Sequence, residues 1–260
     1  MHIVIPKRSE GTKKSNKYMN LEEVLNFRRS VRNYQTDNNL DTEKVKHCLE
    51  MATFAPSSSN MQLWEFYHIT DKAMIQKMAQ ASLGQAAVST ANQLVIFVAR
   101  RDLFRSRAKQ VLAFERENIK RNSPADRQAS RIKGVEVYYG TMMPFLYARF
   151  FGLLGIFRKF LTVSVSLFRP MFTNSTENDQ RVVVHKSCAL AAQTFMIAMA
   201  NEGYDTCPLE GFDSRRVKKL LKLPYGAEIN MIISCGIRNG DKGIRGDRFR
   251  IPFEEVYKVI

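Results

Sequence analysis

The chain has 260 residues, 45% of them hydrophobic, which is enough to bury one large core. Its four cysteines, Cys48, Cys188, Cys207 and Cys235, lie far apart. This spacing excludes a disulfide framework or a zinc site and favours a reduced, cytoplasmic protein. The formal net charge of +15 makes nucleic acid, an anionic membrane or an anionic cofactor a candidate partner.

The N-terminal region predicts an arm followed by a short helix. Residues 1–17 carry charges where a secretory signal needs an apolar stretch, and they lack a small-residue cleavage pattern, so we interpret them as an arm. Asn20 and Glu23 have the spacing of a capping box. They predict a helix through residues 21–27 that ends in the basic turn 28–33.

The next segments predict a second helix and three strands. The helix begins near Asp41 and gives way to a polar loop at 56–62, and the following run Trp64–Ile69 predicts a strand. The runs Leu94–Ala99 and Ile229–Cys235 are continuously apolar. We therefore expect both to lie in the interior of a sheet that helices cover.

The longest helix pattern spans Val182–Asn201 and is apolar on nearly every face. Such a helix is typical of a protein core or a subunit interface. Gly203 should close it, and we interpret residues 203–212 as a loop whose proline and glycines let backbone amides approach a flat ligand.

Residues 101–178 are more basic and more aromatic than the rest of the chain. We interpret the chain as a single domain, 1–260, with this segment as an insertion. It is a candidate lid over a ligand, an extra part of the core and dimer interface, or a basic amphipathic patch on an anionic membrane. We do not expect it to bind nucleic acid, because no recognised motif organises its basic residues. Charged residues interrupt its apolar run before it reaches membrane-spanning length, namely Arg149, Arg158, Lys159 and Arg169.

Four separated segments carry groups suited to a phosphorylated flavin. Residues 28–32 and 248–250 offer guanidinium forks for a phosphate, and residues 56–62 offer hydroxyls and amides for a ribityl chain or a pyrimidine edge. Residues 208–211 offer backbone amides. Taken singly, each segment has a simpler interpretation. Residues 28–32 are typical of a solvated helix end, 248–250 of a basic tail, 56–62 of a serine-rich turn and 208–211 of a connection, so the prediction rests on their combination.

In this order the segments resemble the FMN-dependent nitroreductase family, with its Arg-x-Ser, Pro-Ser-Ser-x-Asn-x-Gln-Pro-Trp and Pro-x-Glu-Gly motifs. The resemblance covers about residues 18–100 and 181–260. It implies an α+β fold with a mixed, mainly antiparallel sheet flanked by helices. It also implies a homodimer with a long central helix and two FMN sites at the interface.

The resemblance assigns the arginine-rich segments to the phosphate end of FMN. The binding residues that it implies there are Arg28, Arg29, Ser30, Arg32, Arg248 and Arg250. Ser30 and Arg32 would reach the ribityl and pyrimidine side. A positive charge near flavin N1 and O2 favours the anionic reduced flavin.

The resemblance assigns the other segments to the flavin ring. The binding residues that it implies there are Pro56, Ser57, Ser58, Asn60, Gln62, Gln85, Pro208, Leu209, Glu210 and Gly211. Asn60 and Gln62 would come from the partner subunit or support their loop, and the amides of Glu210 and Gly211 would point at N5 and O4. Two positions depart from the family pattern: Leu63 replaces a proline, and Gln85 is a weak substitute for a lysine.

The resemblance implies an enzyme that takes electrons from NADH or NADPH and passes them to a nitroaromatic, a quinone or a related small acceptor by a ping-pong mechanism. Hydride transfer needs no protein nucleophile or metal, so we expect no catalytic side chain. His47 and His68 are expected to have surface and structural roles, and Cys207 a packing role. The alternatives are a specialised flavoenzyme of the dehalogenase, ene-reductase or flavin-degrading type, or a basic membrane-associated flavin-binding protein without turnover.

Overall fold

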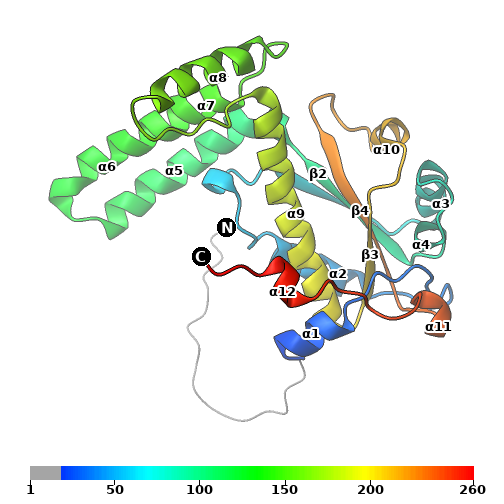
Figure 1. The fold of residues 1–260 in the computed structure, drawn as a ribbon. Helices are drawn as coiled ribbons and strands as arrows, with labels where there is room; N and C mark the ends of the chain where they lie inside the picture. The colour runs from blue at the N-terminus through cyan, green and yellow to red at the C-terminus, as the bar shows by residue number, and fades with distance from the viewer. Residues whose placement is uncertain (1–18) are drawn as a thin grey trace.

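A four-stranded antiparallel sheet lies between two helical layers, and a group of helices, α5 to α8, extends from one end of it (Figure 1). The computed structural model describes residues 19–260, so the arm predicted for residues 1–17 lies outside the described part. In chain order the elements are α1 (Leu21–Phe27), α2 (Thr42–Ala52), η1 (Ser58–Asn60), β1 (Trp64–Ile69), α3 (Lys72–Ala81), α4 (Ala86–Ser89), β2 (Gln93–Ala99), η2 (Arg101–Leu103), α5 (Phe104–Asn122), α6 (Ala125–Val137), the π-helical η3 (Tyr138–Met142), α7 (Met143–Tyr147), α8 (Leu153–Ser166), α9 (Glu177–Asn201), β3 (Asp205–Leu209), α10 (Ser214–Leu220), β4 (Glu228–Gly236), α11 (Gly240–Gly243) and α12 (Phe253–Val256).

The strand order is β1-β2-β4-β3, and each neighbouring pair is antiparallel. The two strands predicted for the sheet interior, β2 and β4, are indeed central, and every residue of β2 is buried. A single parallel bridge between Ser30 and Thr206 extends the sheet beyond β3. The expected mixed, mainly antiparallel sheet is therefore confirmed.

Alternate residues of the central strands enter two separate cores, as the two-residue period of a strand requires. Val95 and Phe97 face α2 and α9. Leu94, Ile96 and Val98 face α3, α4 and α10. Both faces of the sheet are covered, which explains why the sequence of β2 is apolar without interruption.

The predicted starts of the first two helices are confirmed. Asn20 accepts from the backbone N–H of Glu23 at 2.9 Å, and the Glu23 carboxylate accepts from the backbone N–H of Asn20 at 2.7 Å, so both halves of the capping box form. Asp41 caps α2 through the N–H groups of Glu43 and Lys44. These caps satisfy donors that the first turn of a helix leaves unpaired.

Helix α9 begins at Glu177, five residues before the predicted start at Val182. Thr176 and Asp179 form a second capping box there, which the apolar pattern alone did not indicate. By length and composition, α9 is the one helix within residues 19–260 that could cross a membrane. Ten of its 25 residues are buried, and it packs on the sheet as a core helix does.

The segment after α9 differs from the prediction. Gly203 closes the helix at a φ of 76°, as expected, but residues Asp205–Leu209 form the edge strand β3 and not a loop. Pro208 is tolerated in this strand because an edge strand leaves half of its N–H groups unpaired. The connection begins only after Leu209.

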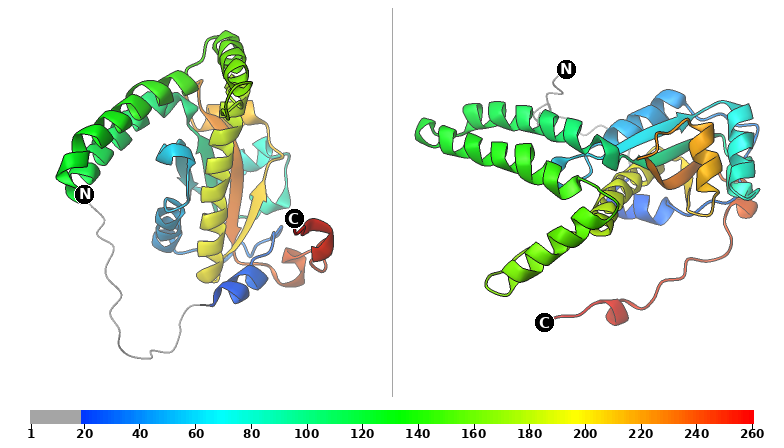
Figure 2. Two further views of the ribbon diagram at one scale, coloured as in Figure 1. Left: turned by 60° about the vertical axis from the view of Figure 1, so that its left-hand side comes forward. Right: turned by 90° about the horizontal axis from the view of Figure 1, so that it is seen from above.

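Residues 101–178 are mostly helical. Helices α5 and α6 form a hairpin, and Figure 2 shows the hairpin and α8 extending from the body in different directions. A third apolar cluster joins Met61 and Leu63 to Ala108 of α5, Tyr147 of α7 and Val184 of α9. The base of the segment is therefore packed onto the body.

Candidate functional site

A cavity of about 210 Å³ lies where the end of α1 meets the C-terminal segment. It is lined by six arginines and one carboxylate, together with three other residues: Arg28, Arg29, Ser30, Arg32, Ile244, Arg245, Asp247, Arg248, Phe249 and Arg250. The structure thus brings together the two arginine-rich segments, which are more than 200 residues apart in the chain. Planar guanidinium groups in this number are suited to a phosphate.

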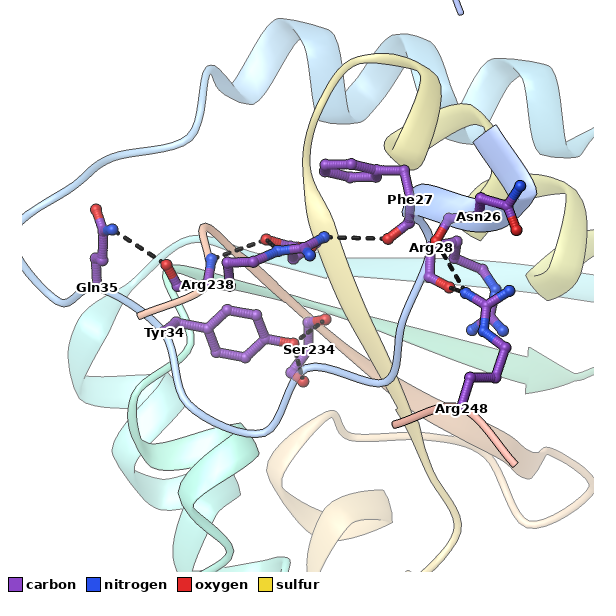
Figure 3. Close-up of polar contacts among 9 residues, drawn as sticks. Asn26, Phe27, Arg28, Tyr34, Gln35, Ser234, Arg238 and Arg248 are labelled. Atoms are coloured by element: carbon purple, nitrogen blue, oxygen red, sulfur yellow. Dashed lines mark hydrogen bonds and ion pairs between the residues drawn. The ribbon is translucent and has the colours of Figure 1, made fainter. Parts of the chain in front are cut away.

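Arg248 holds the end of α1 in place (Figure 3). Its guanidinium donates to the backbone carbonyls of Leu25 at 3.0 Å, Asn26 at 3.0 Å and Arg28 at 2.7 Å. The last carbonyls of a helix have no partner within the helix, so these bonds satisfy them. Arg248 therefore positions the cavity, and its expected direct contact with a phosphate stays a prediction.

Arg238 anchors the same turn from the other side. Its Nε lies 3.0 Å from both carboxylate oxygens of the buried Asp205, and its backbone N–H donates to Asp205 at 2.8 Å. The guanidinium also donates to the carbonyl of Phe27 at 3.1 Å and lies over the Phe27 ring (Figure 3). The start of β3, the segment after β4 and the end of α1 are thereby fixed to one another.

The charges around the cavity repel one another. The pKa of Arg248 is lowered, first by burial and then by the positive charges of Arg250, Arg29 and Arg28. Burial raises the pKa of the Cys207 thiol, because it disfavours the charged thiolate, and the positive charges of Arg32 and Arg28 oppose that rise. An anion in the cavity would relieve this repulsion, so the local electrostatics favour a negatively charged ligand.

The turn after β3 contacts Gln85. The Gln85 side-chain amide donates to the carbonyls of Gly211 at 2.8 Å and Ser82 at 3.1 Å. Leu209 is buried and Pro208 is half-buried, while Glu210 and Gly211 are exposed. The backbone of this turn is thus presented at the surface beside the edge of β3.

The serine-rich loop is held by two neighbouring helices and by a bond within the loop. The N–H of Ser58 donates to the Ser187 hydroxyl of α9 at 3.2 Å, and the hydroxyls of Ser59 and Tyr138 lie 2.7 Å apart. Within the loop, the Gln62 side chain donates to Asn60 at 2.9 Å. Pro56 and Ser58 are exposed and Ser57 is half-buried. Asn60 and Gln62 thus support the loop in their own chain.

The loop and the arginine cavity occupy diagonally opposite corners of the sheet. The loop precedes β1, which is one of the two edge strands. It therefore lies at the end of the sheet where Trp64 of β1 pairs with Ala99 of β2, and Ala99 pairs with Glu228 of β4. Residue Ser30 bridges to Thr206 of β3, the other edge strand, at the end where Thr206 pairs with Cys235. Within one chain, residues 28–32, 85, 208–211 and 248–250 share the β3 edge, and residues 56–62 do not.

His68 bonds within the sheet, His47 is exposed and Cys207 is buried, which are the environments expected from the sequence. His68 bonds to Gln93 at 2.7 Å inside the sheet, and the side chain of His47 is 64% exposed. Cys207 is buried. Within residues 19–260 no group of histidine, cysteine or carboxylate side chains could hold a metal ion.

Sequence reasoning missed four residues that shape the cavity. Arg245 and Asp247 line it, and the Arg238–Asp205 pair positions it. The spacing of Arg245, Arg248 and Arg250 was a readable signal of a basic cluster. The pairing of Arg238 with Asp205 joins residues 33 apart and has no local pattern.

Comparisons with known proteins identify the family of the chain. The family model described as "Nitroreductase family" matches residues 25–237. The chain is 26% identical to DrgA of Synechocystis sp., with 86% of each chain covered. It is 24% identical to MhqN of Bacillus subtilis, a candidate NAD(P)H nitroreductase, covering 89% of this chain and 95% of that one. A candidate nitroreductase from Exiguobacterium sibiricum, solved in complex with FMN, superposes with a TM-score of 0.66 at 20% identity, covering 93% of this chain and 98% of that one. The chain belongs to the nitroreductase family.

Proposed function

We propose that the chain is a homodimeric, FMN-dependent oxidoreductase that passes electrons from NADH or NADPH to a small electron-poor acceptor such as a nitroaromatic or a quinone. The observation that carries this proposal is the cavity with six arginines and one carboxylate, which suits the phosphate of FMN. The FMN complex of the Exiguobacterium protein supports the choice of cofactor. The name of MhqN supports the choice of electron donor.

The size of the cavity fits the phosphate end of FMN and not the whole molecule. Its volume of about 210 Å³ is below the roughly 300–1,000 Å³ of typical ligand pockets. The rest of the cofactor needs further surface. In one chain the serine-rich loop at 56–62 lies too far around the sheet to provide it, since it precedes the opposite edge strand. A second subunit would supply this loop.

Each group of residues then has a distinct task. Arg28, Arg29 and Arg250 would neutralise the phosphate, and Arg248 would add to this while it holds the end of α1. Ser30 and Arg32 would face the ribityl and pyrimidine side. The exposed backbone of Glu210 and Gly211, steadied by Gln85, would lie along the ring after Pro208 and Leu209. When bound, FMN supplies the two-electron chemistry, taking hydride from the nicotinamide and passing electrons to the acceptor in ping-pong order.

Two exposed apolar regions support the dimer. A groove of about 480 Å³ runs between α1, α2 and α9, with Leu21, Met51 and Ile197 among its walls. The C-terminal segment exposes Phe249, Ile251, Phe253 and Val256. Apolar surface of this extent is typical of protein interfaces. A second copy of the chain would cover both regions.

We also propose that residues 101–178 form an insertion in a single domain and that its base shapes the acceptor pocket. The Tyr138 hydroxyl contacts Ser59, and the Tyr139 hydroxyl donates to the Ser59 carbonyl at 3.1 Å. The insertion is therefore attached to the loop that would line the flavin. Because all four cysteines are free and buried, we further propose a cytoplasmic location.

The proposal is tested by titrating the purified protein with FMN and following the visible absorbance of the flavin. We expect a yellow complex with one FMN per chain, and a dimer by size-exclusion chromatography. Anaerobic turnover with NADH and NADPH against a panel of nitroaromatic, quinone, enone and halogenated acceptors then identifies the reaction. A protein that stays colourless would contradict the proposal, and turnover limited to enones or halogenated compounds would favour the specialised flavoenzyme.

A further inference from the structure

Helix α8 has its polar side toward the protein. Arg158 is only 2% exposed, and its guanidinium donates to the backbone carbonyls of Phe145 at 2.7 Å, Ala148 at 3.0 Å and Ser175 at 2.9 Å. Thr162 bonds to the Ser175 hydroxyl at 2.9 Å, and Lys159 donates to the Thr173 carbonyl at 2.8 Å. The polar side chains of α8, which on a surface helix would normally face water, thus form hydrogen bonds with the protein instead.

The opposite side of α8 is apolar and faces outward. Four of its exposed side chains recur at helical spacing and form one stripe, namely Leu153, Ile156, Phe157 and Phe160, and the exposed Leu167 and Phe168 follow directly after the last residue of the helix. Ile156 is 67% exposed, Phe160 71% and Phe168 89%. Figure 2 shows α8 extending away from the sheet, and the exposure of these side chains means that nothing within residues 19–260 covers the apolar stripe. An uncovered surface of this kind marks a site of interaction.

The turn before α8 adds to this surface. Phe151 has a φ of 48°, in the left-handed region that a phenylalanine rarely adopts, and it is 95% exposed. Gly152 follows with a φ of 84° and precedes the first residue of α8. The backbone thus bears a strained conformation that holds an aromatic ring outward at the tip of the turn.

The charges around α8 indicate the chemistry of what covers it. The stretch between Glu136 and Glu177, which contains α8, has four basic residues, Arg149, Arg158, Lys159 and Arg169, and no acidic residue. Arg149 and Arg169, which are exposed, flank the two ends of the helix. A second copy would bring the same excess of four positive charges against this stretch. An anionic lipid surface would instead complement it.

The length of α8 decides how it would meet a bilayer. Its 14 residues span about 21 Å at 1.5 Å per residue, less than the roughly 30 Å hydrocarbon core of a membrane. The helix is therefore too short to cross. Helices with one apolar face and flanking basic residues lie in the plane of the membrane interface.

We propose that α8, with Phe151 and the basic residues at its ends, docks the protein onto anionic lipid bilayers, with the helix lying parallel to the membrane plane. The apolar stripe would enter the boundary between headgroups and acyl chains, while Arg149 and Arg169 contact lipid phosphates. This inference does not depend on flavin binding, because the stripe and the arginine cavity belong to different elements.

The test is sedimentation of the full-length protein with two kinds of vesicles, phosphatidylcholine alone and phosphatidylcholine with 30% phosphatidylserine. We expect binding to the anionic vesicles that weakens with added salt, and little binding to the neutral ones. The double variant Ile156→Ser/Phe160→Ser should lose roughly tenfold or more in lipid affinity. Arg169→Glu should lose affinity for the anionic vesicles only.

Matched control variants distinguish the effect of the stripe from a general effect of exposed apolar side chains or of surface charge. The double variant Leu83→Ser/Tyr225→Ser removes two apolar side chains outside the stripe that are 75% and 94% exposed. The variant Arg215→Glu reverses an exposed charge on α10. Both control variants should bind vesicles as the unaltered protein does. Far-ultraviolet circular dichroism and flavin absorbance check that each variant is folded. Absence of binding to anionic vesicles would overturn the proposal, as would binding that the stripe variant retains. A smaller assembly for the stripe variant in lipid-free size-exclusion chromatography would identify the stripe as a contact between copies and overturn it as well.

Discussion

At the scale of single residues, the arginines of the cavity fall into two groups. Some form hydrogen bonds that hold the site together, and others keep their guanidinium available to a ligand. Arg248 donates to three carbonyls and Arg29 donates to the carbonyl of Gly246 at 2.8 Å, so both have structural bonds. Among the hydrogen bonds formed within residues 19–260, Arg28 contributes its backbone groups and not its guanidinium. Arg28, like Arg32 and Arg245, therefore has a guanidinium that is available to a phosphate.

The substitution Arg28→Ala should weaken FMN binding by roughly 1.5 to 3 kcal/mol, the value of a hydrogen bond to a charged group. It should leave the fold unchanged, since the backbone bonds of residue 28 to Val24 and Arg248 do not use its side chain. Fluorescence titration of the apoprotein with FMN measures the effect. Arg215→Ala, an exposed arginine on α10, is the control and should bind FMN normally. Arg248→Ala should lower both FMN affinity and stability, whereas unchanged affinity in Arg28→Ala would contradict the assignment.

The residues that we expect to contact a ligand could be proposed from the sequence more readily than the residues that position them. The four segments could be recognised because guanidiniums, hydroxyls and prolines occur in short patterns, such as Arg28-Arg29-Ser30. Arg238 and Asp205 have no such pattern, because their pairing arises only when β3 and β4 are adjacent. Their importance follows from tertiary structure alone.

At the scale of helices and strands, an ion pair at the corner of the sheet joins α9 to β4. Glu228 at the start of β4 bonds to His185 at 3.3 Å and to Arg181, both on α9. The hydrogen bond from His185, followed by the one from Arg181, lowers the pKa of Glu228 to about 2 although burial opposes this. A carboxylate with a lowered pKa stabilises the fold above its unfolded pKa, and this contribution is lost as the pH falls toward its folded pKa.

Glu228→Gln should therefore lower the free energy of unfolding by about 1 kcal/mol at pH 7, a value reduced for the partial exposure of the pair. The difference from the unaltered protein should shrink as the pH falls from about 4.5 toward 2, where Glu228 itself becomes protonated. Urea unfolding at pH 7, 4 and 3, at one fixed protein concentration, measures it. A difference that is constant with pH would show that the charge of Glu228 is not the cause.

Element prediction succeeded where the local pattern and the tertiary environment agree. The strands β1, β2 and β4 were found because continuous or alternating apolar runs match their burial in the sheet. Strand β3 was interpreted as a loop because Pro208 and the nearby glycines are typical of loops, while its edge position tolerates a proline. The early start of α9 was missed because polar residues fill its first turn and a capping box, rather than an apolar face, defines it.

At the scale of the whole molecule, one chain leaves three surfaces incomplete. The arginine cavity is smaller than a typical ligand pocket, the serine-rich loop lies at the opposite corner of the sheet, and α8 presents an apolar stripe. A two-fold dimer that placed the loop of one subunit at the cavity of the other would complete two equivalent sites, because each contact in such a dimer occurs twice. The stripe on α8, with its positive surroundings, is better matched by anionic lipid.

The division of the site between two chains can be tested by combining two defective subunits. The first carries Arg28→Ala/Arg250→Ala in the arginine cavity, and the second carries Ser58→Asp, which places a carboxylate in the serine-rich loop. Each homodimer should bind FMN poorly because both of its sites contain the defect. In the mixed dimer, isolated through two different affinity tags, one site combines both defects and the other combines two unaltered halves.

We therefore expect the mixed dimer to bind one FMN per two chains with the affinity of the unaltered protein, and to recover about half of its turnover per dimer. If instead each chain formed a complete site by itself, both sites of the mixed dimer would be defective and no affinity would return. Flavin titration of the three dimers distinguishes these outcomes directly. The result depends on the diagonal placement of β1 and β3, since a loop and a cavity at the same corner of the sheet would allow a site within one chain.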